Sequence, residues 1–237
     1  MKRVALLGGS FNPPHPGHFE MGDYIFRSLG VDEVWFLFSE NWQKDVSKLA
    51  PTEHRMKMGE ILAGHYPDSP FVMSDIQDKL KTHITYKVLS ELKDKFPNHQ
   101  FVWVMGADNL ATFHTWEHFE DIIENYPVAV VDRPPYTKNA QNSYTALTYA
   151  HLKKDDAPDI IKSGKGWCFL DNPRINMSSS DLLIRLRNGE TKFEGPFQDV
   201  ADYIIQNRLY GIAVNKPEKT SKSDSDTAPD EKAPDVS

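Results

Sequence analysis

The sequence predicts a doubly wound α/β fold, a single domain built on a mostly parallel sheet. Short apolar runs recur along the chain, and several are continuous rather than alternating, which is typical of strands buried on both faces. Longer amphipathic stretches separate these runs, and strand–helix alternation implies right-handed crossovers between parallel strands. We expect the strands at Val4–Leu7, Val34–Phe38, Phe71–Ser74, Phe101–Met105, Val128–Val131 and Trp167–Leu170.

Helix boundaries are predicted from residues that start or stop helices, such as Gly30 after one stretch and Pro97 after another. We expect helices at His18–Leu29, Glu53–Ala63, Thr85–Lys95, Trp116–Glu124 and Asp181–Asn188. The polar stretch 137–164 is compatible with helix. The folded domain is expected at residues 1–211. Residues 212–237 should form a disordered polar tail, because they include no aromatic residue and too little apolar surface to fold.

Composition argues against several classes of protein. A chain of 237 residues with 39% hydrophobic content can bury one substantial core. The net charge of -7 and the pI of about 5.7 argue against a general nucleic-acid binder. No apolar run has the length of a membrane span or of a signal-peptide core, so we expect a cytoplasmic protein with no nucleic-acid or membrane partner. The single cysteine, Cys168, cannot form an internal disulfide and is expected in the core rather than as a nucleophile.

The segment Gly8-Gly9-Ser10-Phe11-Asn12-Pro13-Pro14-His15-Pro16-Gly17-His18 directly follows the first apolar run. It predicts a strand, a glycine turn and a helix that opens at Gly17-His18. A glycine turn allows close approach of a ligand, and a helix N-terminus directs free N–H groups and partial positive charge toward it. Two histidine rings add N–H donors. The segment therefore indicates a polyphosphate site, although a glycine turn can also serve only to reverse the chain.

Two better-known nucleotide patterns are absent. The sequence has neither G-x-G-x-x-G nor G-x-x-x-x-G-K-[ST] after this strand, so neither a dinucleotide fingerprint nor a P-loop is indicated. Ligands of parallel sheets bind beyond the carboxyl ends of the strands. His15, His18 and Asp108, which follow two different strands, should therefore face one cleft.

Three blocks together resemble a known family. The His-x-Gly-His motif after Gly-Gly-Ser-Phe-Asn-Pro resembles the signature of the nucleotidyltransferase superfamily. The blocks from Phe101 to Trp116 and from Ala129 to Tyr136 resemble bacterial-type nicotinate-nucleotide adenylyltransferases. The likeness runs from Val4 to about Gly211. It implies a Rossmann-like fold and transfer of AMP from ATP to the 5′-phosphate of nicotinate mononucleotide, releasing pyrophosphate, as a step of NAD biosynthesis.

The resemblance also implies roles for individual residues. His18 should stabilise the α-phosphate, His15 should contact the β- or γ-phosphate, and Lys44 should reach a phosphate from a loop. The residues expected at ATP are Gly8, Gly9, Ser10, Phe11, Gly17, Gly106, Asp108, Ser178, Ser179, Ser180 and Arg185. Those expected at nicotinate mononucleotide are Asn12, Thr85, Asn109, Trp116 and Arg133. Mg²⁺ should arrive with ATP, carried by phosphates and water, because no carboxylate cluster suggests a protein metal cage.

Several of these residues have a simpler alternative role. Lys44 could be solvated, and Asp108 or Asn109 could cap the following helix. Trp116 could be a half-buried core aromatic, and Arg133 could only brace its loop.

The main departure from the family pattern lies in Met177-Ser178-Ser179-Ser180-Asp181-Leu182-Leu183-Ile184-Arg185. The family pattern, roughly I-S-S-T-x-I-R, clamps the triphosphate, and its arginine falls on Leu183. Arg185 is two residues later, about 200° around an ideal helix. Either the helix begins late and Arg185 takes over, or the clamp lacks its arginine; Arg187 is a further candidate.

The chemistry needs no general base, because the nucleophile is already an anionic phosphate oxygen. Positioning and electrostatic stabilisation therefore carry the mechanism. Two alternatives stay open: a nucleotidyltransferase with another phosphate acceptor, and a non-catalytic nucleotide-binding regulator, which the leucine at position 183 would favour. The choice between nicotinate and nicotinamide acceptors and the oligomeric state are not settled by the sequence.

Overall fold

A computed structural model describes residues 1–39, 48–132, 134–171 and 177–212 of the chain. Six strands form one sheet in the order β3-β2-β1-β4-β5-β6, and every neighbouring pair is parallel. The strands are β1 (Lys2–Gly9), β2 (Glu33–Phe38), β3 (Phe71–Ser74), β4 (His99–Gly106), β5 (Pro127–Val131) and β6 (Gly166–Leu170). The predicted doubly wound α/β fold is confirmed. The strand order reverses between β1 and β4, which is where parallel sheets bind ligands.

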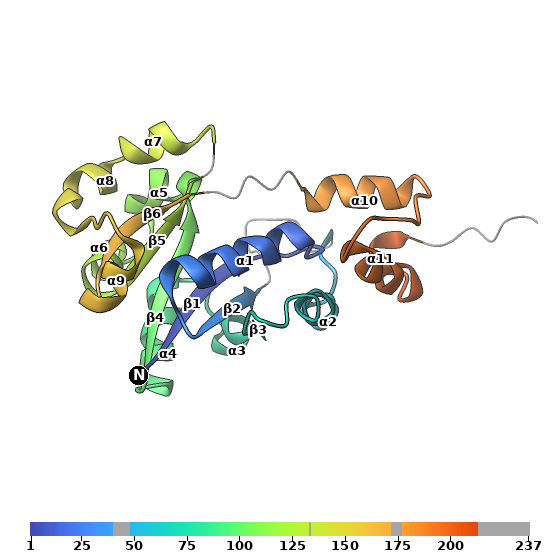
Figure 1. Cartoon of the computed structure of the whole chain (residues 1–237), viewed down its shortest axis with the longest axis horizontal. Coiled ribbons are helices and arrows are strands. Elements are labelled where there is room, and N and C mark those ends of the chain that lie inside the picture. The colour runs from blue at the N-terminus through green and yellow to red at the C-terminus, as the bar shows by residue number, and fades with distance from the viewer. Residues whose placement is uncertain (40–47, 133, 172–176, 213–237) are drawn as a thin grey trace, which may run out of the picture.

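Helices cover both faces of the sheet. One face carries α1 (Pro16–Leu29), α2 (Thr52–Ala63), α9 (Ala157–Ser163), α10 (Ser179–Arg187) and α11 (Phe197–Gln206). The other carries α3 (Ile76–Leu80), α4 (Thr85–Lys95), α5 (Ala107–Thr112), α6 (Phe119–Asn125), α7 (Thr137–Gln141) and α8 (Tyr144–Thr148). Short 3-10 turns lie at η2 (Phe113–Thr115), η3 (Ala150–Leu152) and η4 (Leu209–Gly211). In Figure 1, α10 and α11 lie on the opposite side of the molecule from α6, α7 and α8.

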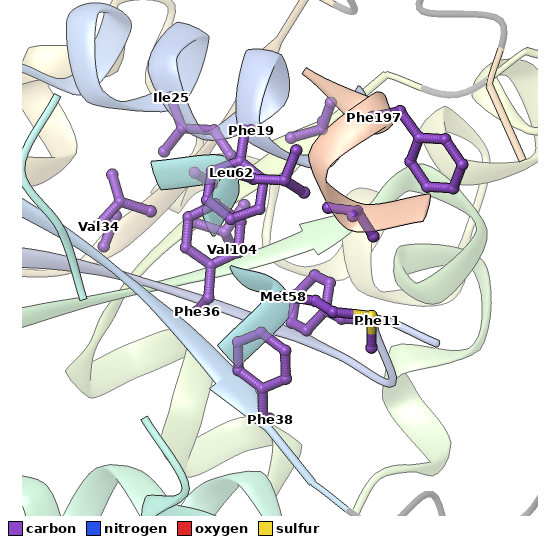
Figure 2. Packing of buried hydrophobic residues seen from close by; sticks show 14 of the residues in the cluster. Phe11, Phe19, Ile25, Val34, Phe36, Phe38, Met58, Leu62, Val104 and Phe197 are labelled. Carbon is purple, nitrogen blue, oxygen red and sulfur yellow. The ribbon is translucent and has the colours of Figure 1, made fainter. Parts of the chain in front are cut away.

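The apolar cluster between the sheet and α1, α2 and α11 also fixes the loop after β1. Phe11 of that loop is buried in this cluster, 4.8 Å from Phe38 between ring centroids, and Figure 2 labels it among the residues of the cluster. A Cβ atom at Gly9 would lie only 2.8 Å from the Phe11 ring, closer than carbon atoms pack, so any larger residue there would have to displace that ring. The hydrophobic core thus sets the path of the glycine-rich loop.

All six predicted strands are present, and helix boundaries differ by a few residues. α1 begins at Pro16 rather than at Gly17, with His15 as its N-cap, because proline fits the first position of a helix. The predicted helix 116–124 instead starts as α6 at Phe119, because His118 adopts a left-handed backbone conformation (φ 59°). Stretch 137–164 is largely helical, as α7, α8 and α9.

The predicted tail is described only at its first residue. Ile212 is 6% exposed and packs in the first cluster, so it belongs to the folded part, and residues 213–237 lie outside the described residues. Across the described ranges, no helix combines the length and apolar character needed to cross a bilayer.

Candidate active site

A cavity of about 1460 Å³ lies at the carboxyl ends of β1, β4 and β5. Its walls come from the β1–α1 loop, the residues before α2, the start of α5, one face of α10, and η4. The predicted residues that line it are Gly8, Gly9, Ser10, Phe11, Asn12, His15, Gly17, His18, Gly106, Asp108, Asn109, Ser178, Ser179 and Ser180. The fold therefore brings together, at one site, sequence blocks that are far apart in the chain.

The two histidines of the motif form a stacked pair at the start of α1. Their ring centroids are 3.7 Å apart and the ring planes differ by 26°. The backbone N–H of His15 donates to Nδ1 of His18 at 3.2 Å. Since Nδ1 accepts, the proton of a neutral His18 ring is on Nε2, which makes this atom a hydrogen-bond donor.

His15 is 6% exposed, and burial lowers its pKa to about 4. The ring is therefore neutral near pH 7, because desolvation penalises the charged form. A neutral imidazole still provides one N–H donor. His15 therefore presents a hydrogen-bonding ring rather than a full positive charge.

The loop between these histidines and β1 is held by distant side chains. Asn12 donates through Nδ2 to the Lys48 carbonyl at 3.0 Å, and its Oδ1 accepts the Ala50 N–H at 3.0 Å. The Ser179 hydroxyl donates to the Pro13 carbonyl at 2.8 Å and so links the loop to α10. Asn12 borders the cavity as predicted, but these bonds give its side-chain amide a structural function as well.

The N-terminus of α10 opens into the cavity. Ser178 is its N-cap, and its hydroxyl accepts the Asp181 N–H at 3.5 Å. The free N–H groups and the positive end of a helix favour anions at such a position. The three serines of the predicted clamp therefore lie where phosphate oxygens can be bound.

One face of α10 continues this wall. Ser180, Leu183, Ile184 and Arg187 all line the cavity, the spacing of residues that share a helical face. Arg185 points elsewhere: its guanidinium binds Glu190 at 2.8 and 2.5 Å and lies 4.7 Å from the centre of the Phe193 ring. The prediction that Arg185 takes over the clamp is not supported, because α10 starts at Ser179 and so turns Arg187, not Arg185, toward the cavity.

Two exposed arginines border the cavity, Arg187 on α10 and Arg208 just before η4. Within the described ranges, neither guanidinium makes a hydrogen bond or an ion pair with another residue. The sequence does not indicate Arg208 as a site residue, because no local pattern shows that η4 lies beside the cavity. Its left-handed backbone conformation (φ 52°) lies between α11 and η4, where the chain turns toward the cavity.

The remaining predicted residues are not in the wall of the cavity. Thr85 is buried at the start of α4, and Trp116 packs edge-on against Phe113 at 5.2 Å, on the face of the sheet that carries α3 to α8. Lys44 and Arg133 lie outside the described residues. Asp108 and Asn109 lie inside the first turn of α5, whose N-cap is Gly106, so neither is a helix cap.

The polar groups of the cavity suit an anion better than a directly bound metal. The carboxylates in its wall are Asp108 and Asp132, and Asp132 accepts a hydrogen bond from the Thr137 hydroxyl. In the described part of the chain, no group of three or more His, Cys, Asp or Glu residues could hold a metal ion. Cys168 lies in the core, where burial raises its pKa to about 12 and keeps the thiol protonated.

Comparisons with known proteins identify the family of this chain and match its fold. The cytidylyltransferase-like family profile matches residues 6–185. A protein of Brucella abortus named "Probable nicotinate-nucleotide adenylyltransferase" is 34% identical over 194 residues, 80% of this chain and 98% of the relative. A protein of the same name from Methylorubrum extorquens is 37% identical over 187 residues, 77% of this chain and all of the relative.

The fold is also that of solved structures. A Plasmodium falciparum nicotinic acid mononucleotide adenylyltransferase complexed with NaAD matches with a TM-score of 0.63 and 22% identity, over 90% of this chain and 98% of the other. A second structure of that enzyme, complexed with APC, matches with a TM-score of 0.62. The family profile and the sequence relatives cover most of the chain. The chain belongs to the nicotinate-nucleotide adenylyltransferase family, within the cytidylyltransferase-like nucleotidyltransferases.

Proposed function

We propose that this protein transfers AMP from ATP to the 5′-phosphate of nicotinate mononucleotide, giving deamido-NAD and pyrophosphate. The observation that carries the proposal is the cavity at the strand reversal, where a stacked histidine pair and the N-termini of α1 and α10 meet. Its volume of about 1460 Å³ exceeds the ~300–1,000 Å³ of an ordinary small-molecule site, which leaves room for two nucleotides. The names of the relatives support the same reaction.

The chain's own groups suit an in-line attack on the α-phosphate. The acceptor phosphate attacks as an anion, so the enzyme must align the two phosphates and stabilise the charge that moves onto pyrophosphate. In this proposal, His18 donates from Nε2 to the α-phosphate, and the backbone N–H groups of Ser10 and Phe11 bind the reacting phosphates. His15 and the serines at the start of α10 bind the β- and γ-phosphates, and Lys44 stays a predicted phosphate contact.

Two arginines complete the phosphate site in this proposal. Arg187 stands one turn after Leu183, the position where the family pattern has its arginine, and on the same face of α10. Arg208 borders the cavity from η4. We assign both to the triphosphate, because a guanidinium pairs well with phosphate oxygens and these two have no competing carboxylate among the described residues.

Mg²⁺ is proposed to enter as the ATP complex. The cavity supplies mainly N–H and hydroxyl donors, and its two carboxylates do not form a cage, so phosphate oxygens and water are the natural ligands of the ion. When bound, the ion would neutralise charge on the departing pyrophosphate. Asn109 borders the cavity, and we assign it to the acceptor nucleotide. Thr85, Trp116 and Arg133 stay predicted contacts of the pyridine nucleotide.

The test is pyrophosphate release from ATP and Mg²⁺ with nicotinate mononucleotide, nicotinamide mononucleotide or phosphopantetheine as acceptor. Fast release with nicotinate mononucleotide supports the proposal. Preference for phosphopantetheine would keep adenylyl transfer and reject the pyridine acceptor. No release of pyrophosphate from folded protein that still binds ATP would favour a non-catalytic regulator. Leu183 in the cavity wall, where the family pattern has arginine, is the observation that favours this alternative.

A further inference from the structure

Arg55 is a fully buried arginine directly beneath the phosphate loop. It lies in the first turns of α2, is 1% exposed, and does not line the cavity. Arginine is rarely this buried unless every donor has a partner. The guanidinium donates through Nη1 to the Ser10 carbonyl at 2.6 Å and to the Ser39 carbonyl at 3.0 Å. Nε donates to the Ala50 carbonyl at 2.8 Å, and Nη2 to the Thr52 hydroxyl at 2.8 Å.

The bond to Ser10 fixes the direction of the next amide. A trans peptide group is planar, and its C=O and N–H point in opposite directions. Because the Ser10 carbonyl is held by Arg55, the Phe11 N–H must point to the side away from Arg55. Ser10 and Phe11 line the cavity and Arg55 does not, so that side is the cavity.

The loop needs such an anchor. Phe11 has a φ of 42°, in the left-handed region that is unfavourable for a residue with a side chain. Its ring is held by Phe36 and Phe38, at centroid distances of 5.5 and 4.8 Å. The ring fixes the position of the residue, and the bond from Arg55 fixes the orientation of the peptide before it.

The same guanidinium stabilises the neighbouring wall of the cavity. It binds the carbonyl of Ala50, while the N–H of Ala50 is bound by Asn12. The Thr52 hydroxyl that receives Nη2 donates in turn to Asp78 at 3.0 Å. Arg55 therefore joins the phosphate loop, the end of β2 and the segment before α2 into one unit.

We propose that Arg55 is a positioning residue for adenylyl transfer, which aims the Phe11 N–H at the reacting phosphates by holding the Ser10 carbonyl. The inference rests on the proposed function, since it assigns these phosphates to the cavity. A structural role alone would affect only folding. A positioning role affects kcat in enzyme that is fully folded, and it depends on the forked shape of the guanidinium rather than on its charge alone.

The experiment compares Arg55→Lys, Arg55→Ala and the control Ile123→Ala, a fully buried residue of α6 on the other face of the sheet. For each, kcat, KM for ATP and Tm are measured, and kinetics are run well below each Tm. Arg55→Lys keeps the charge but loses the fork. We expect its kcat to fall roughly 10- to 100-fold, as a misplacement near 1 Å does, with a smaller change in KM. Ile123→Ala should lose stability and keep kcat.

Chemical rescue separates positioning from loss of fold. Removing the side chain leaves space for a free guanidinium ion, so millimolar guanidinium should raise kcat of Arg55→Ala about tenfold or more. It should not activate Arg55→Lys, Ile123→Ala or the parent protein. A folded Arg55→Lys enzyme with the kcat of the parent would overturn the proposal. So would an Arg55→Ala enzyme whose loss is not restored by guanidinium and parallels that of Ile123→Ala.

A binding readout distinguishes failure of this inference from failure of the proposed function. If the parent protein prefers another acceptor, the same kinetics are measured with that acceptor. If it shows no turnover, the Phe11 amide resonance is followed during titration with inorganic pyrophosphate. We expect a shift in the parent protein and a much smaller one in Arg55→Lys. Equal shifts in the two proteins, or no shift in the parent, would contradict the assigned role.

Discussion

Replacing Arg187 should weaken ATP binding, whereas replacing Arg185, two residues earlier, should not. Arg187 lines the cavity, and the Arg185 guanidinium is held by Glu190 on another side of α10. A guanidinium about 5 Å from a phosphate charge contributes roughly 3 kcal/mol at an effective dielectric constant near 20. Arg187 is exposed, so salt screens part of this interaction, and we expect about half of that energy to remain.

The corresponding change is about a tenfold rise in KM for ATP in Arg187→Gln, with a smaller change in kcat. Arg185→Gln is the matched control, because it removes another exposed cation from the same helix. Its KM should change by less than about twofold, as expected for an exposed charge outside the site. Steady-state kinetics at two salt concentrations provide the assay, and the Arg187 effect should shrink at high salt. Equal effects of the two substitutions, or a larger effect of Arg185→Gln, would refute this reading of α10.

Three further predictions concern the loop and its histidines. His18→Ala should lower kcat about 10²–10³-fold, as loss of one preorganised donor does, and His18→Gln, which can keep a donor near the Nε2 position, should retain more activity in the same assay. His15, with its pKa lowered to about 4, stays neutral while the unfolded chain takes up a proton below pH 6.5. The free energy of unfolding therefore falls as pH drops from 6.5 toward 4. Between pH 7.5 and 5, urea unfolding should show that His15→Gln loses about 2 kcal/mol less of this free energy than the parent protein. Parallel pH dependences of the two proteins would contradict this. Gly9→Ala should displace the Phe11 ring and lower both Tm and kcat, since its Cβ would lie 2.8 Å from that ring; an unchanged Tm would show that the ring can move freely.

The strands could be predicted from the sequence because most of them are continuous apolar runs. Val34–Phe38 and Val128–Val131 are buried on both faces, and such runs are distinctive when helices separate them. The motif after β1 was equally informative, since its glycines, prolines and histidines act through local geometry. Short helices were harder: α3 and α5 have five and six residues, too few for an amphipathic period to appear.

The rest of the site depends on contacts between distant segments. Whether Arg185 or Arg187 faces the cavity depends on where α10 begins, and Ser179 begins it while bonded to Pro13. Arg208 reaches the cavity because the chain turns back after α11. Arg55 resembles any arginine of an amphipathic helix until the fold places four oxygen acceptors around its guanidinium. None of these facts has a local sequence signal.

Identification of the product in a competition experiment tests the central claim most directly. The protein is incubated with ATP, Mg²⁺ and equal concentrations of nicotinate mononucleotide, nicotinamide mononucleotide and phosphopantetheine. The adenylylated products are then separated, identified and quantified by mass spectrometry. We expect deamido-NAD as the main product, pyrophosphate in equal amount, and a parallel fall in the rate of formation of both in His18→Ala. Dephospho-coenzyme A as the main product, or deamido-NAD formed at an undiminished rate by His18→Ala, would contradict it.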